Sequence, residues 1–442
     1  MKRLFLSLFA AVVAVSPVFA QAKPMAFINA RIIPIVGQPI EQGILLVQNG
    51  KITAVGDART VRLSSDVTIV DMAGKTIMPG IVDTHSHIGG PAGADSTSPI
   101  QPDVRILDSV NVQAASIQRA QAGGVTVANI MPGSGHLDSG QTLYLKLRDD
   151  AVKIDDLLIY DKAGKYMGGI KFANGTNPMR AGGGSFPGTR AKSAALVREV
   201  FIKAQEYKEK VAKAAGDKTK LPPRDLAMEA LVEVLDQKRT VHFHTHRHDD
   251  IMTALRLQKE FGFKLVLQHV SEAWKVADEI AKAKIPASII MIDSPGGKLE
   301  TVDVDYKNGA ALEKAGALVG FHTDDGITDS RWFLRSAGVA VRAGMSRDKA
   351  LYGMTMAGAI MLEMQDRIGS LESGKDADFV ILSGDPLSIY THVEQTWVDG
   401  KKVFDRSRPE DHIFATGGKG ASDEGDAMGH DDGDEDGDGG GN

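Results

Sequence analysis

The prediction of this fold starts from one stretch, Met78-Pro79-Gly80-Ile81-Val82-Asp83-Thr84-His85-Ser86-His87. Residues 81–85 have the composition of a short buried strand. Because alternate residues of a strand face the same side, His85 and His87 project together at its end. Neutral imidazoles are common zinc ligands, so the pair predicts half of a metal site. Two hydrogen-bonded polar residues at a strand end would give the same pattern, and further ligands are needed to distinguish the two.

The beginning of the chain has the pattern of a secretory signal. Lys2 and Arg3 precede an apolar run over residues 4–15, and Val18-Phe19-Ala20 offers small residues where a signal peptidase cleaves. We expect residues 1–20 to be removed and the protein to be exported, periplasmic or secreted. The apolar run is short for a membrane span, so no stable membrane anchor is expected after cleavage, and a retained N-terminal anchor is the alternative.

Composition restricts the chemistry. The 442-residue chain contains no Cys, which excludes disulfides, a lipoprotein anchor and thiolate metal sites. A metal would therefore be held by His, carboxylate or a modified Lys. The formal charge of −6 comes mainly from residues 423–442, which carry nine acids and no Lys or Arg. The rest is close to neutral, so nothing indicates nucleic acid as a partner.

Both ends of the body contain short alternating strands. Asn49-Gly50 and Asp399-Gly400 are hairpin turn signals between such strands. We therefore expect residues 21–78 and 368–408 to form one small β-sandwich, with residues 79–367 inserted as a single domain. Residues 409–442, which become rich in Gly and Asp, are predicted to be a disordered acidic tail.

The inserted domain alternates short apolar runs with segments of helical pattern, which indicates an α/β fold with a parallel sheet. The number of strands fits an eight-stranded (β/α)8 TIM-like barrel if one strand lies near residues 143–147 or 157–160. A doubly wound sheet is the alternative, but no Gly-x-Gly-x-x-Gly follows a first strand.

Further ionisable residues stand where the predicted strands end. His242, His244 and His246 share one face of a strand, His269 ends the next strand, and the run His322-Thr323-Asp324-Asp325 ends another. Inward-facing imidazoles are costly to bury without partners. Active sites of parallel barrels lie at the carboxyl ends of the strands, so this pattern predicts a functional site.

Taken together, these motifs resemble the amidohydrolase superfamily. The resemblance rests on residues 78–87, on His244, His269 and Asp324 in that order, and on Gly374-Lys375-Asp376-Ala377-Asp378-Phe379-Val380. The chain is most similar to the imidazolonepropionase-like and prolidase-like members. The resemblance implies a distorted (β/α)8 barrel with a β-sandwich built from both termini.

The resemblance also implies a ligand set. Two divalent ions, expected to be zinc, would be held by His85, His87, Lys171, His244, His269 and Asp324. Lys171, the only lysine of Gly168-Gly169-Ile170-Lys171-Phe172, would be carboxylated and bridge the ions; a surface or substrate-binding lysine is the alternative. Asp324 would be the general base, and His269 could steady an oxyanion. His246, His136 and Arg247 are candidates for substrate binding, whereas the roles of His242, His248 and His322 stay open.

The predicted function is hydrolysis of a C–N bond in a cyclic amide, an amide or a dipeptide, by a metal-activated hydroxide with Asp324 as base. A deaminase or a lactone or ester hydrolase could use the same ligands, because specificity lies in the loops. A non-catalytic metal-binding protein is a further alternative. The expected partner is a small-molecule substrate, and a homo-oligomer is left open.

Overall fold

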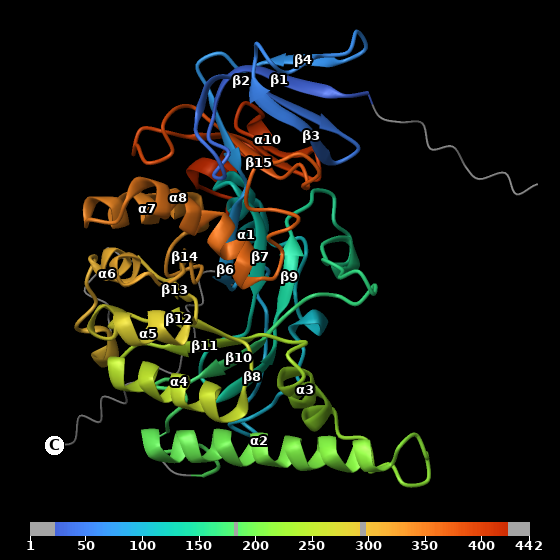
Figure 1. Cartoon of the computed structure of the whole chain (residues 1–442), viewed down its shortest axis with the longest axis vertical. Helices are drawn as coiled ribbons and strands as arrows, with labels where there is room; N and C mark the ends of the chain where they lie inside the picture. Colours follow the sequence, from blue (N-terminus) through green and yellow to red (C-terminus); the bar gives the residue numbers. More distant parts are fainter. Residues whose placement is uncertain (1–22, 181–183, 292–297, 423–442) are drawn as a thin grey trace, which may run out of the picture.

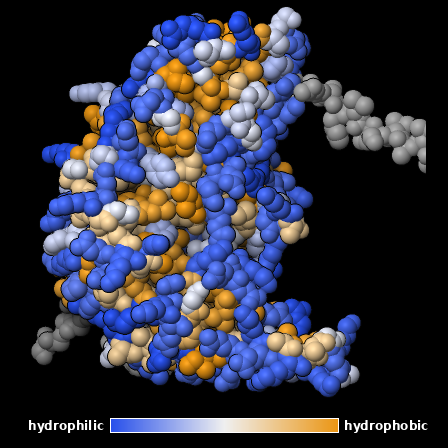
Figure 2. Space-filling model, viewed as in Figure 1, coloured by the Kyte–Doolittle hydropathy of each residue, from blue (hydrophilic) through white to orange (hydrophobic). Residues whose placement is uncertain are grey.

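A computed structural model describes residues 23–180, 184–291 and 298–422. The predicted signal peptide and most of the predicted acidic tail lie outside these residues. Figure 1 shows a β-rich part at one end and a larger α/β part below it. Figure 2 shows one largely hydrophilic face on which hydrophobic residues gather in patches. Among the described residues, no helix is long and apolar enough to cross a membrane.

The two ends of the chain form one eight-stranded sheet in the order β17-β16-β15-β5-β1-β2-β3, with β4 paired to β1. Its strands are β1 (Met25–Ile32), β2 (Ile40–Gln48), β3 (Lys51–Asp57), β4 (Thr68–Asp71), β5 (Thr76–Pro79), β15 (Phe379–Leu382), β16 (Val393–Val398) and β17 (Lys401–Asp405). The antiparallel pairing of β5 with β15 joins the N-terminal and C-terminal segments. The predicted union of both ends is therefore confirmed.

Turn chemistry and aromatic packing stabilise this sheet. Both predicted hairpin turns have positive φ at both central residues, 51° and 74° at Asn49-Gly50 and 49° and 70° at Asp399-Gly400, as a type I′ turn requires. Phe27 packs edge-on against Phe379 and Trp397, with ring centroids 5.0 and 5.1 Å away. These rings come from both ends of the chain, so their packing fixes one end against the other.

The second part is the barrel. Its parallel strands are β6 (Ile81–Ser86), β7 (Val125–Ile130), β10 (Ile170–Ala173), β11 (Val241–Thr245), β12 (Leu265–His269), β13 (Ala287–Ile289) and β14 (Val319–Phe321). The predicted α/β fold is confirmed. The backbone N–H of Asp324, just after β14, donates to the carbonyl oxygen of His85 at 2.9 Å, which brings the last strand beside the first.

The strand expected near residues 143–147 is present, but its direction differs from a regular barrel. β8 (Asp138–Gln141) and β9 (Leu143–Lys146) together take the place of the third barrel strand. β8 runs antiparallel to β10, and β9 runs antiparallel to β7. A parallel strand needs a crossover of a dozen or more residues. The short connection between Ile130 and Asp138 is too short for one, so the chain reverses.

Helices cover the barrel and pack against the sheet. They are α1 (Ala115–Ala122), α2 (Arg190–Lys213), α3 (Leu226–Leu235), α4 (His248–Phe261), α5 (Ala277–Ala283), α6 (Asn308–Ala315), α7 (Phe333–Arg342), α8 (Arg347–Met354), α9 (Met356–Met361) and α10 (Pro409–Thr416). Single turns of 3-10 helix are η1 (Ile106–Asp108), η2 (Ile154–Asp156), η3 (Ala273–Lys275), η4 (Leu299–Thr301) and η5 (Ser330–Trp332). Phe201 of α2 stacks on Phe172 of β10 with centroids 5.6 Å apart.

The segment expected to be disordered from residue 409 instead begins with α10. Pro409 stands at the start of this helix, where its fixed φ and missing N–H are tolerated. Beyond α10, Ala421 is buried and its carbonyl oxygen accepts a 3.1 Å hydrogen bond from Arg119 of α1. The described chain is therefore ordered against the barrel up to this point.

A buried lysine connects the barrel to the terminal sheet. Lys146 at the end of β9 is fully buried, and its Nζ lies 2.8 Å from Asp376 and 3.0 Å from Asp378. It also forms an ion pair with Asp399 at the β16–β17 turn. Asp376 and Asp378 belong to the segment 374–380 that contributes to the family resemblance. Their ion pairs with Lys146 therefore hold the two parts of the molecule together.

Candidate metal centre

Ionisable side chains converge at the carboxyl ends of the barrel strands. His85 lies on β6 and His87 follows it; Lys171 lies on β10, His244 on β11 and His269 at the end of β12, and Asp324 follows β14. The fold thus brings together all six residues that the family resemblance assigns to the metals. The site is built at the carboxyl ends of five strands of the barrel, as expected for a barrel enzyme.

The tautomer of His87 shows how this cluster is organised. His87 Nδ1 lies 2.8 Å from the carbonyl oxygen of Met131, which can only accept, so Nδ1 carries the proton. In the neutral ring Nε2 then presents a lone pair. It faces Asp324 Oδ1 at 2.9 Å and His85 Nε2 at 3.3 Å. The lone pairs of His87 Nε2 and of the Asp324 carboxylate repel each other at this separation unless a proton or a cation lies between them.

Lys171 is the most unusual member of the cluster. It is fully buried, and its Nζ lies 3.0 Å from His85 Nε2 and 3.3 Å from Met131 Sδ. Lys171 pairs in register with His242, one layer below His244, so its long side chain extends up to the site. Burial and then the positive charge of Lys171 hold the pKa of His85 well below its usual value. A cation among imidazoles is a costly arrangement unless the amine is modified.

Asp324 lies among three imidazoles. Its Oδ1 is 3.2 Å from His85 Nε2 as well as 2.9 Å from His87, and its Oδ2 is 3.8 Å from His269 Nδ1. Burial raises the pKa of the Asp324 carboxyl, but the interactions with His85 and His269 outweigh it and bring the pKa well below its usual value. The group is therefore a carboxylate at neutral pH.

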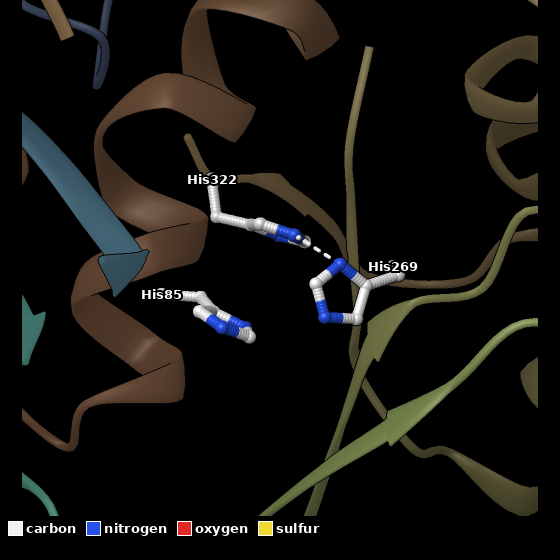
Figure 3. Close-up of side chains that lie close together, drawn as sticks. All are labelled: His85, His269 and His322. Atoms are coloured by element: carbon white, nitrogen blue, oxygen red, sulfur yellow. Dashed lines mark hydrogen bonds between the residues drawn. The ribbon is translucent and has the colours of Figure 1, made fainter. Parts of the chain in front are cut away.

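A chain of hydrogen bonds orients His269 (Figure 3). His322 Nε2 and His269 Nδ1 are 3.0 Å apart, and the other ring nitrogen of His322 lies 2.8 Å from Ser288 Oγ. Ser288 in turn is 2.6 Å from Thr84 Oγ1. His85 stacks on His322, with centroids 5.0 Å apart. His322, whose role the sequence left open, thus binds Nδ1 of His269. The other ring nitrogen of His269, Nε2, has no hydrogen-bond partner.

His244 and His246 form the other side of the cluster. Neither ring nitrogen of His244 has a hydrogen-bond partner, although the side chain is buried. His246 Nδ1 lies 2.8 Å from Ser271 Oγ, and its ring stacks on His269. Ligand atoms of His244, His246 and His269 all lie within 4.8 Å of one another. His246, predicted to contact substrate, is therefore also placed as a third nitrogen donor for an ion here.

Glu300 was not identified from the sequence. It lies on η4, between β13 and α6, and is nearly fully buried. Its Oε2 accepts a 2.7 Å hydrogen bond from the N–H of Thr176, whereas Oε1 has no hydrogen-bond partner and lies 3.9 Å from His244 Nε2. Burial raises its pKa, but His244 and His246 outweigh this and lower it to about 2. A buried carboxylate oxygen beside an unpartnered imidazole adds to the cation-attracting character of the site.

Two aspartates that lie close in sequence to residues of the cluster, Asp83 and Asp325, make different hydrogen bonds. Asp83 accepts hydrogen bonds from the backbone N–H groups of His85 and Thr323, and so ties β6 to the segment that carries Asp324. Asp325 accepts a 2.9 Å hydrogen bond from the N–H of Ser330 and lies 3.7 Å from Arg119. The Asp325 side chain therefore faces away from the cluster.

Other predicted residues are engaged elsewhere. His242 is a buried barrel residue between Tyr144 OH at 2.9 Å and Gln268 Nε2 at 3.1 Å. His136 Nε2 donates to the carbonyl oxygen of Asp95 at 2.7 Å. Arg247 is bound by Asp249, and His248 Nδ1 lies 2.6 Å from Glu272. None of these contacts joins His136, Arg247 or His248 to the metal cluster. The roles of His136 and Arg247 in substrate binding therefore stay predictions.

The donor set fits divalent cations. Imidazole and carboxylate donors with no thiolate suit zinc and related ions. The lone pairs facing Asp324 Oδ1 and the unpartnered nitrogens of His244 and His269 form two adjacent groups of donors. His87 and His269 each use their second ring nitrogen for a hydrogen bond, which is the usual arrangement of metal-binding histidines.

Comparison with known proteins agrees with this site. A family model described as "Amidohydrolase family" matches residues 76–403. An amidohydrolase from Thermotoga maritima MSB8 superposes with a TM-score of 0.80 at 37% identity, over 86% of this chain and all of that one. Imidazolonepropionase of Alkaliphilus metalliredigens is 22% identical over 84% of this chain and 92% of its own length.

One relative is much longer than this chain. Amidohydrolase tasK of Hapsidospora irregularis is 27% identical over 82% of this chain, but the match spans only 40% of its length. The extent of the family match, together with the shared fold and the converging ligand set, leaves a single conclusion. The chain belongs to the amidohydrolase family, whose members are metal-dependent hydrolases acting on carbon–nitrogen bonds.

Proposed function

We propose that this protein hydrolyses the C–N bond of an amide, a cyclic amide or a dipeptide, with two zinc ions held at the histidine cluster. The observation that carries the proposal is the group formed by His87 Nε2, His85 Nε2 and Asp324 Oδ1, all within 3.3 Å of one another. Bound divalent ions would lower the pKa of a water molecule and polarise the substrate carbonyl. The proton transfers of the reaction are assigned to a side chain of this chain.

Asp324 is proposed as the general base. Its carboxylate is the acceptor at the centre of the cluster, and its lowered pKa keeps it ionised at neutral pH. It takes the proton of the attacking water and passes it to the leaving amine. Cleavage of the amide then yields a carboxylate and a protonated amine, and Asp324 is again unprotonated.

Lys171 is proposed to be carboxylated. The ammonium group would first lose one proton, and the neutral amine would then add to CO2 to form a carbamate with release of a second proton, so that a buried positive charge becomes a negative one. This change supplies oxygen donors beside His85 and between the two groups of histidines. The support is the full burial of Lys171 and the 3.0 Å distance from its Nζ to His85 Nε2.

Metal content and product analysis test this function. The full-length protein, purified without chelators, is analysed for metal and then assayed with dipeptides, N-acyl amino acids and five-membered cyclic amides. His87→Ala serves as the inactive control. We expect two zinc ions per chain and release of an amine or ring-opened product by the parent chain alone. Turnover that is the same in His87→Ala, or absent from every amide in the zinc-loaded parent, would contradict the proposal.

A deaminase or an ester hydrolase on the same barrel is the second candidate function. Release of ammonia from an amino-substituted ring would favour deamination, and turnover of lactones faster than of amides would favour ester hydrolysis. Both alternatives use the same ligands, so only the product distinguishes them.

Export is proposed as well. It is supported by the Lys2-Arg3 start, the apolar run after it, and the small residues up to Ala20. Cleavage after Ala20 or Ala22 is expected, and N-terminal sequencing of the exported protein tests it. An exported chain that still begins at Met1 would contradict cleavage.

A further inference from the structure

A second concave surface lies apart from the histidine cluster and shares no residue with it. This groove has a volume of about 800 Å³ and is formed by α7, the loop between β15 and β16, and the end of α10. Four arginines line it, Arg331, Arg335, Arg342 and Arg406, together with His392. The described residues that line it include no carboxylate. The groove therefore carries an excess of basic side chains.

Two of these arginines are available for an incoming anion. Arg331 is held by Asp329 through paired 2.9 Å contacts. By contrast, the side chains of Arg342 and Arg406 make no hydrogen bond or ion pair with any residue of the described ranges. Both residues line the groove, where a carboxylate could bind each guanidinium group in bidentate fashion.

The groove also has an apolar side. Trp332 is 50% exposed and Ile389 is 64% exposed, and both line it. Exposed Trp and Arg side chains in one concave surface are the composition of a protein-binding site rather than of an ordinary solvated face. The fitting occupant is therefore an acidic peptide segment that brings a few apolar atoms.

This chain contains such a segment next to the groove. Ala415 and Thr416 at the end of α10 line the groove, and Gly417 packs close to the guanidinium of Arg331. The residues that follow, 423–442, carry nine acids and no Lys or Arg, with Met428 among them. Extended chain spans about 3.3–3.6 Å per residue, so ~20 residues reach well beyond the groove.

We propose that residues 423–442 bind in this groove of the same chain, with their carboxylates on Arg342 and Arg406 and their apolar atoms against Trp332. A tethered segment is present at an effective concentration in the millimolar range, so weak ion pairs are enough to hold it. Bound in this way, the segment covers Trp332 and neutralises the groove. Salt would release it, because exposed ion pairs are screened.

The absence of cysteine from the chain allows a direct test on the full-length protein. Met428→Cys is labelled with bimane, whose fluorescence tryptophan quenches on contact. The emission is compared with that of the same labelled chain carrying Trp332→Phe. We expect lower emission when Trp332 is present, equal emission of the two chains at about 1 M NaCl, where the Debye length is about 3 Å, and no dependence on protein concentration.

Charge reversal supplies the matched control. Arg342→Glu with Arg406→Glu should abolish the quenching, whereas Lys162→Glu with Lys210→Glu, an equal charge change at exposed sites outside the groove, should keep it. Circular dichroism of each variant establishes folding. Equal emission with and without Trp332 at low salt would overturn the proposal. Quenching that appears only at high protein concentration would also overturn it, because the segment would then occupy the groove of a second copy.

Discussion

Replacing Asp324 by Asn separates metal binding from proton transfer. Asn keeps the shape and one oxygen donor, so the fold and part of the metal content should remain. It has no carboxylate to take a proton from water. Loss of a positioned general base costs about 10²–10⁴-fold in rate, or about 2.7–5.4 kcal/mol in activation free energy. The position of Asp324, 2.9 Å from His87 and 3.2 Å from His85, predicts a loss in this range.

The assay is kcat/KM on the amide of the panel that the parent chain turns over fastest, measured with excess zinc, beside metal content and thermal unfolding. Asp325→Asn is the matched control, because Asp325 binds Ser330 and Arg119 instead of the cluster. It should cost about 1–3 kcal/mol of stability through lost buried hydrogen bonds, with kcat/KM per folded chain near that of the parent. A metal-loaded Asp324→Asn enzyme with near-parent turnover would refute the assignment of the base.

Three further predictions follow from the structure. Glu300→Gln removes a buried charge 3.9 Å from His244 and should weaken zinc affinity in a chelator competition; an unchanged affinity would show that Glu300 does not act on the ion. Lys146→Met removes the cation that Asp376, Asp378 and Asp399 share and should cost about 3–5 kcal/mol in urea unfolding, although Asp376 keeps Lys51 and Asp399 keeps Arg148; metal content per folded chain should be unchanged. Burial lowers the pKa of His242 to about 3, below the value of about 6.5 in the unfolded chain. Unfolding therefore takes up a proton between these pH values, and stability falls as pH falls. His242→Gln should reduce that slope by about 1.4 kcal/mol per pH unit, and equal slopes in the two proteins would contradict the buried neutral state.

The strand-end pattern predicted a functional site at one face of the barrel, and the family resemblance supplied the set of metal ligands. His85, His244, His269 and Asp324 each follow or end a run of apolar residues, and the alternation of a parallel barrel places such ends at one face. The hairpin turns were equally clear, since Asn49-Gly50 and Asp399-Gly400 have the backbone freedom that type I′ turns need.

Other features depend on three-dimensional contacts that no local pattern encodes. Glu300 reaches the cluster from a single turn of 3-10 helix between β13 and α6, where neither periodicity nor spacing marks it. The reversed direction of β9 follows from a short connection, and the apolar pattern of a strand is the same in both directions. The bond between His322 and His269 required the positions of two separate strands, and α10 was missed because a Gly- and Asp-rich segment follows it.

The most direct test of the central claim is an anomalous difference map, recorded at the zinc edge from crystals of the zinc-loaded protein. The account predicts two peaks, one within bonding distance of His85, His87 and Asp324 and one within bonding distance of His244 and His269. It also predicts density for a carbamate on Lys171 between them. A single peak with an unmodified Lys171 would refute the two-ion centre, and no peak at the cluster would contradict the metal-dependent chemistry altogether.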